Sequence, residues 1–212
     1  MKEKKTILSL AILSAMMALV ITPASGQRIA LRRPFEKGTL IGTGGFTYSN
    51  SGGELYNQDG ERTTQFSFNP SISYFVTSGL ALGLRGSISY TSRGGQTGTG
   101  LGIGPEVSYY LRKKRDAKAR VVMAKGTIVP YFSAGAMFSG TSGNYPTQWG
   151  NYDYKNSGTT LDLGAGFLYM LSQGYGIFVR ASFEYSTKSQ NGGDSKHGNR
   201  FVITGGLSAF GF

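Results

Sequence analysis

The sequence predicts an all-β fold, an eight-stranded antiparallel up-and-down barrel that crosses a membrane. Three observations carry this prediction. Apolar residues alternate with small or polar ones, the pattern recurs in eight segments of the 212-residue chain, and an apolar leader stands in front of them. Alternation with a period of two puts one kind of side chain on each face of a strand, which a helix does not do.

The clearest alternating segment covers residues 65–76. Its even positions, from Phe66 to Val76, are apolar or aromatic, and its odd positions, from Gln65 to Ser73, are small or polar. A soluble sandwich would turn the apolar face to a core, whereas an outer-membrane barrel turns it to lipid. One strand alone does not distinguish these two folds. The recurrence of the pattern and the leader in front of it favour the membrane barrel.

The leader has a basic start, an apolar run over residues 7–21 and small residues at Ala24-Ser25-Gly26. This order is typical of a secretory signal peptide. A membrane anchor is the alternative, but the run is short for a spanning helix and ends at Pro23. We predict a signal peptide over residues 1–26, a basic periplasmic lead-in over 27–37, and one barrel domain over 38–212.

The composition agrees with an exported barrel. The chain has no cysteine, so the sheet rather than disulfides must hold the mature protein together. Its 33 glycines suit a narrow barrel, where an inward glycine makes room for a large neighbour. The formal charge of +11 falls to +9 once three lysines and Glu3 leave with the leader.

The eight expected strands differ in clarity. They cover residues 39–48, 65–76, 80–90, 101–111, 128–138, 160–169, 175–186 and 201–212. Pro70, Pro105 and Pro130 lack a ladder donor, so each is expected to mark a bulge or a locally weak pairing. The last strand has large apolar residues on both parities, among them Phe201 and Phe210, and is expected to be bulged or two-sided.

Loop lengths and aromatic residues orient the barrel. Longer polar loops are expected after strands one, three, five and seven, at residues 52–62, 93–98, 140–158 and 187–199, and tight turns after strands two and six. Aromatic residues fall at both strand ends, as in membrane-interface belts. One set is Tyr74, Tyr109, Tyr169, Tyr175 and Phe212, and the other is Tyr48, Phe66, Tyr90, Phe138 and Tyr185.

The chain resembles the small eight-stranded outer-membrane barrels of the OmpA/OmpX-like kind. The resemblance rests on the leader, the eight strands, Pro130-Tyr131 with Gly135 in the fifth strand, and the terminal Phe212. It implies a location in the cell outer membrane, interior ion pairs, and a carboxy-terminal aromatic signal at Phe212 that the barrel-assembly machinery reads. These motifs specify the architecture much more than an activity.

Five charged residues are expected to face the interior. They are Arg85, Glu106, Asp162, Arg180 and Glu184. An eight-stranded barrel has an interior that side chains nearly fill, so these charges should pair and form a plug. We expect Arg85 and Glu106 at one height, near Arg180, and Asp162 and Glu184 higher up. If the two upper carboxylates face each other, they need Arg180, a cation or a shared proton. A gated narrow pore is the alternative.

Little in the sequence suggests an enzyme. Outer-membrane lipid A deacylases and acyltransferases use a histidine with a serine and an acid, and the only histidine is His197, near Asp194 and Ser195 in a predicted loop. We interpret it as a solvated histidine. Cysteines are absent and histidines do not cluster, so no metal or other cofactor is expected.

Two further patches are candidates for interactions. A periplasmic basic patch, expected to contact anionic headgroups or a periplasmic protein rather than nucleic acid, contains Arg112, Lys113, Lys114, Arg115, Lys118 and Arg120. An outward loop at residues 144–156 contains Tyr145, Trp149, Tyr152 and Tyr154, which suit a binding surface or an extended girdle.

The sequence therefore predicts an outer-membrane barrel without catalysis, serving envelope integrity or surface interaction. Its expected partners are outer-membrane lipids, the barrel-assembly machinery during biogenesis, and an extracellular or envelope protein. The alternatives are a narrow gated channel, a lipid A-modifying enzyme, and an accessory of an outer-membrane secretion machine.

Overall fold

The computed structural model describes residues 34–51, 63–93, 96–111, 126–147, 150–172, 174–190 and 195–211. The signal peptide predicted for residues 1–26 lies outside these ranges and stays a prediction. The strands are β1 (Leu40–Ser51), β2 (Thr63–Thr77), β3 (Leu80–Arg93), β4 (Gln96–Tyr110), β5 (Ile128–Thr147), β6 (Gly150–Met170), β7 (Tyr175–Gln190) and β8 (Ser195–Gly211).

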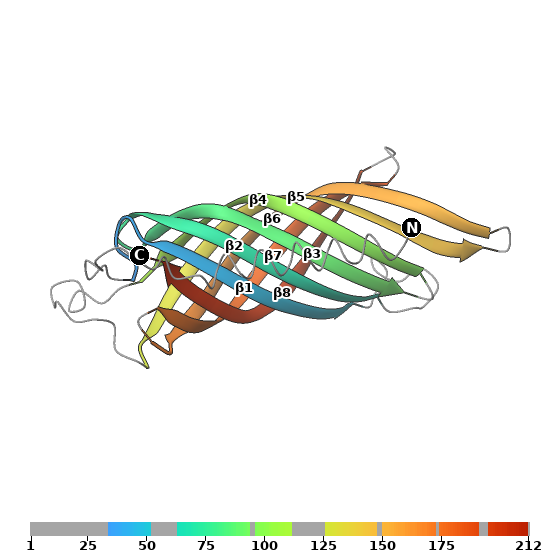
Figure 1. Ribbon diagram of the computed structural model, residues 1–212. Helices are drawn as coiled ribbons and strands as arrows, with labels where there is room; N and C mark the ends of the chain where they lie inside the picture. Colours follow the sequence, from blue (N-terminus) through green and yellow to red (C-terminus); the bar gives the residue numbers. More distant parts are fainter. Residues whose placement is uncertain are drawn as a thin grey trace.

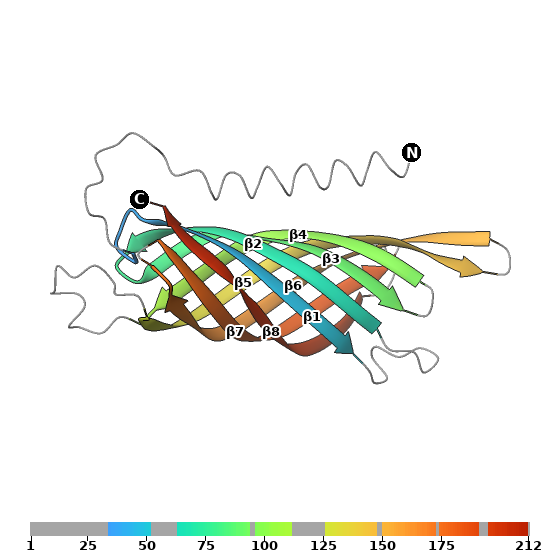
Figure 2. The same cartoon turned by 60° about the horizontal axis from the view of Figure 1, so that its bottom comes forward.

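The strands close into a barrel in which each pairs antiparallel with its neighbour in sequence and β8 returns to β1 (Figure 1). The predicted fold, a closed eight-stranded antiparallel barrel, is confirmed. We call the end of the barrel that holds the β2–β3 turn the turn end. The opposite end, where β5 and β6 extend furthest, is called the hairpin end (Figure 2). Gly79, at a φ of 87°, makes the tight β2–β3 turn.

The outer face of the barrel is apolar, as the alternation predicts. Leu163 and Phe201 are 67% and 68% exposed, while their neighbours Asp162 and Val202 point inward and are buried. The described members of both aromatic sets are exposed, and Tyr48, Phe66 and Tyr90 stand in register across β1, β2 and β3. Water would hydrate this surface poorly, whereas lipid matches it.

Within the described residues, no helix is both long and apolar enough to span a membrane.

Several stretches expected to be loops are strands. The β3–β4 ladder continues to Arg93 and Gln96, and the β5–β6 ladder continues to Thr147 and Gly150. The loop predicted for residues 140–158 is therefore wrong, and a hairpin takes its place. Turn-forming residues are frequent there, but consecutive cross-strand pairs satisfy the backbone. Beyond Phe138 the hairpin adds about 30 Å of strand.

The prolines weaken pairing without causing bulges. Ladder pairs between β2 and β3 are missing at Asn69 and Pro70, and those between β4 and β5 at Gly104 and Pro105, although the register continues on either side. Pro130 sits in an uninterrupted β5–β6 ladder and forms no bulge, but the β4–β5 ladder ends at the preceding pair, Tyr110 with Tyr131, so the pairing is weak on that side only. The β8 register is continuous, so that strand is two-sided rather than bulged.

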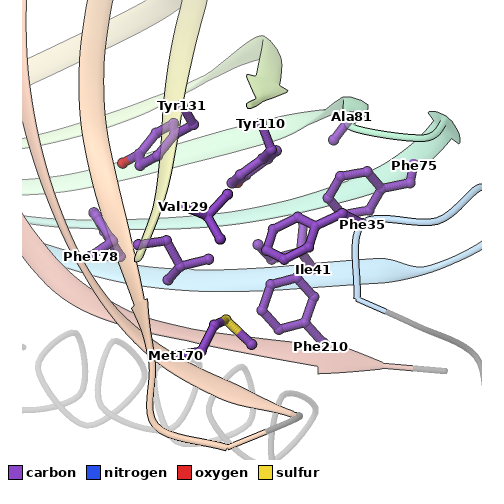
Figure 3. Close-up of a cluster of buried hydrophobic side chains, with 11 residues drawn as sticks. Phe35, Ile41, Phe75, Ala81, Tyr110, Val129, Tyr131, Met170, Phe178 and Phe210 are labelled. Carbon is purple, nitrogen blue, oxygen red and sulfur yellow. The ribbon is translucent and has the colours of Figure 1, made fainter. Parts of the chain in front are cut away.

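The interior near the turn end contains an apolar cluster (Figure 3). Phe35 lies at its centre, fully buried, with its ring 5.6 Å from Phe75, 5.0 Å from Tyr110 and 5.0 Å from Phe210. Its carbonyl accepts a hydrogen bond from the Gly79 amide at 2.9 Å. The end of the lead-in thus folds into the barrel mouth, which its basic composition did not predict.

Candidate functional site

Four of the five predicted interior charges meet in one layer, which we call the ion layer: Arg85, Glu106, Asp162 and Arg180. The Asp162 carboxylate accepts hydrogen bonds from both arginines, including one from Arg85 Nη1 to Asp162 Oδ2 at 3.1 Å. Glu106 Oε2 lies 3.4 Å from Arg85 Nη1 and 3.8 Å from Arg180 Nη1. Residues from β3, β4, β6 and β7 therefore bridge the interior.

The ion layer is neutral and largely buried. Two guanidinium groups balance two carboxylates, and the Asp162 side chain has no accessible surface. Removing charges from water costs several kcal/mol each, so such a group is stable only while its partners remain. Glycine makes room for it, because a side chain at position 164 would press on Arg180 Nε.

Glu184 does not join the ion layer. Although it stands in register with Asp162 on the neighbouring strand, its carboxylate accepts a hydrogen bond from Arg200 Nε at 2.7 Å. Arg200 also donates from Nη1 to Gln65 Oε1 at 2.9 Å. Asp162 and Glu184 thus face each other in register, as expected, and Arg180 is one partner of Asp162, but they share no partner, because Arg85 and Arg180 hold Asp162 while Arg200 holds Glu184.

Arg200 was not predicted as an interior charge because it lies between the loop expected at residues 187–199 and the strand expected at 201–212. The available signal was its parity, since Arg200 precedes Phe201 and Phe201 faces outward. Phe35 was missed because no alternation surrounds it. A lone aromatic residue next to a proline and close to the first strand was the only hint.

A cavity of about 70 Å³ lies inside the barrel. The charged residues that line it are Arg85, Glu106, Arg180, Glu184 and Arg200. Small hydroxyl and amide side chains line much of it toward the hairpin end, among them Thr47, Gln65 and Thr204. Tyr110 and Tyr131, whose rings stack 5.2 Å apart, line it toward the turn end. A cavity of this size holds a few water molecules.

The remaining predicted site residues are only partly described. The basic patch from Arg112 to Arg120, Trp149 and Phe212 lie outside the described residues. Tyr145, Tyr152 and Tyr154 lie on the β5–β6 hairpin, where Tyr145 pairs with Tyr152, and their backbone alone is described.

His197 lies on β8 rather than in a loop. Its ring stacks on Tyr185 with a 6.1 Å centroid separation, and Nδ1 lies 3.2 Å from the Thr187 hydroxyl. Among the described residues, no acidic side chain is hydrogen-bonded to its ring, and those residues contain no cluster of potential metal ligands. This arrangement resembles surface packing more than an activated nucleophile.

No family model matches the chain, and no curated protein matches it. Solved structures with a similar fold include the N-terminal β-barrel domain of OprF from Pseudomonas aeruginosa, at 16% identity and a TM-score of 0.46, covering 82% of this chain and 98% of that one. Neisserial surface protein A shares 16% identity at a TM-score of 0.45, with 82% and 95% covered. Ail, the attachment invasion locus protein of Yersinia pestis, shares 19% identity at 0.42, with 81% and 99% covered.

At these identities the similarity concerns the fold alone. Each of the three is a protein to which this chain is similar in architecture.

Proposed function

We propose that the protein is a sealed outer-membrane barrel that strengthens the envelope and presents the β5–β6 hairpin at the cell surface, without catalysis. The observation that carries this proposal is a bore filled at two levels. The ion layer bridges the interior, and the apolar cluster around Phe35 fills the mouth at the turn end. The turn end is then periplasmic and the hairpin end extracellular.

The membrane location is supported by the outer face. Exposed apolar side chains surround the barrel, and the aromatic residues at both strand ends suit the two lipid interfaces. We expect the mature chain to fold only with detergent or lipid and to fractionate with outer membranes. A chain that stays folded and monodisperse in plain buffer would make it a secreted β-protein instead.

The seal is tested by conductance in planar bilayers. The wild-type barrel should show no steady ion current, because the ion layer and the apolar cluster around Phe35 fill the bore. Arg180→Ala removes a long side chain from the ion layer and should let current pass if the ion layer is the barrier. Stepwise currents through the wild-type protein would favour the narrow channel over the sealed barrel.

The surface role rests on the length of the β5–β6 hairpin. Tyrosine and tryptophan are frequent at binding hot spots, and Tyr145, Trp149 and Tyr152 occur within it. We expect pull-downs from intact envelopes to recover a protein partner that is lost when residues 141–156 are replaced by a short turn. Recovery of the same partner with the shortened barrel would refute a role of the hairpin. Lipid A mass spectra that change on expression would instead support an enzyme.

A further inference from the structure

The β1–β8 seam is paired over only part of its length. Ladder pairs run from Leu40 with Gly211 to Phe46 with Gly205, seven in all, whereas β7 and β8 share fifteen. Toward the hairpin end, residues 47–51 of β1 pair with β2 alone, and residues 200–204 of β8 pair with β7 alone. Among the described strands, this seam has the shortest ladder.

Two side-chain contacts cross the seam where the ladder is absent. Thr47 Oγ1 lies 2.9 Å from Thr204 Oγ1, and Arg200 reaches from β8 to Gln65 on β2. Both are single contacts between side chains. A side chain changes its rotamer more easily than a ladder of backbone hydrogen bonds breaks.

The surroundings of the seam are apolar on one side and polar on the other. Phe201 and Ile203 point outward from β8 and are 68% and 62% exposed, and Tyr48 points outward from β1. On the inner side, Thr47, Arg200, Val202 and Thr204 line the cavity. Tyr48 belongs to the aromatic set at the hairpin end, so the edge without a ladder begins at the lipid interface, where the polar head of an amphiphile lies.

The cavity has more accessible positive than negative charge. Its charged lining residues are Arg85, Arg180, Arg200, Glu106 and Glu184. Asp162 balances the arginines but is fully buried, so it does not line the cavity. Arg200 is the most accessible of the three, with 29% of its side chain exposed, compared with 9% and 10% for Arg85 and Arg180.

The geometry points to a lateral binding site for a single-chain anionic amphiphile at the β1–β8 seam. The head group, a carboxylate or a phosphate, enters between Thr47 and Thr204 and accepts hydrogen bonds from Arg200. The acyl chain stays in the membrane along Phe201 and Ile203. An amphiphile is the class of ligand that fits a wall with a polar cavity on one side and hydrocarbon on the other.

A disulfide across the seam tests this site. The chain has no cysteine, so Thr47→Cys with Thr204→Cys introduces one defined pair whose side chains face each other. Native mass spectrometry would titrate the reduced and oxidised protein with oleate, oleoyl-lysophosphatidylglycerol and uncharged monoolein. We expect one anionic amphiphile per reduced barrel, bound at least tenfold more tightly than monoolein, and at least a tenfold loss on oxidation.

A matched control locks a seam that has a complete ladder. Thr160 and Ser186 also face each other with their hydroxyl oxygens 2.9 Å apart, on β6 and β7. The oxidised Thr160→Cys, Ser186→Cys variant should bind like wild type. Glu184→Gln with Arg200→Gln, which removes one charge of each sign, should reduce binding of the anionic amphiphiles at least tenfold without changing that of monoolein.

The comparison of oleate with the lysophospholipid shows whether the natural head group is a carboxylate or a phosphate. Three results would overturn the site: no binding of either anionic probe, equal affinity for monoolein, or unchanged affinity after the Thr47–Thr204 lock. A barrel that conducts ions but binds the anionic probes would overturn the sealed-barrel function and leave this site standing.

Discussion

The two halves of the barrel interior are built differently. Toward the turn end, aromatic rings and the ion layer fill the bore, and the β1–β8 ladder is intact. Toward the hairpin end, the cavity is lined by small polar side chains, one partly accessible ion pair remains, and that ladder stops. The half at the turn end therefore supplies most of the stability, and the half at the hairpin end has room to bind a ligand.

Asp162→Asn should be the most damaging change, because it leaves two buried arginines with one carboxylate, Glu106, between them. We expect a loss of about 3–5 kcal/mol in the free energy of unfolding. Urea unfolding in lipid bilayers would measure it. Restored stability on combining Asp162→Asn with Arg85→Gln would show that unpaired charge is the cause, and wild-type stability of the single variant would contradict a structural ion layer.

Phe35→Ala should cost about 3 kcal/mol, since it removes a fully buried ring from the centre of the apolar cluster. Phe46→Ala is the matched control, because Phe46 faces outward and is 49% exposed. The same unfolding experiment should show a clearly smaller loss for Phe46. Equal losses would mean that Phe35 does not anchor the turn end.

Gly206→Ala tests the part of the β1–β8 seam where the ladder is complete. An added methyl group there would collide with the Gly44 carbonyl oxygen, and we expect a loss of about 1–3 kcal/mol. At Gly205 the nearest atom to such a methyl is the Phe178 carbonyl oxygen, 3.8 Å away. Gly205→Ala should therefore be tolerated, and equal sensitivity at both positions would argue against close contact of β1 and β8.

Glu184→Gln should have the smallest effect, about 1 kcal/mol or less. Arg200 remains partly accessible to water and keeps its hydrogen bond to Gln65, so its charge is not stranded. A double-mutant cycle with Arg200→Gln would give the coupling energy. A coupling as large as that between Asp162 and Arg85 would remove the contrast between the two halves.

The sequence predicted most of the fold because one physical rule governs every strand. A membrane barrel has hydrocarbon outside and packed polar groups inside, so alternation marks each strand directly. It also selected the residues of the ion layer. It misjudged the height of Asp162, since counting residues from strand ends ignores the tilt and stagger of barrel strands.

The errors arose where alternation carries no information. Above the lipid both strand faces meet water, so the β5–β6 hairpin has the composition of a loop while its backbone stays paired. Phe35 lies outside any strand, and its position depends on Phe75, Tyr110 and Phe210, which come from other parts of the chain. Such a contact becomes apparent only once the barrel has closed.

The contact between Phe35 and Phe210 also bears on how the chain reaches its folded state. The two rings lie 5.0 Å apart although they belong to opposite ends of the described chain. Contacts between residues so distant in sequence form slowly, because a long loop must close before they can stabilise anything. The joining of the two chain ends should therefore limit the rate of folding into the membrane. A polypeptide that lacks its last residues should accumulate as an open, protease-sensitive intermediate.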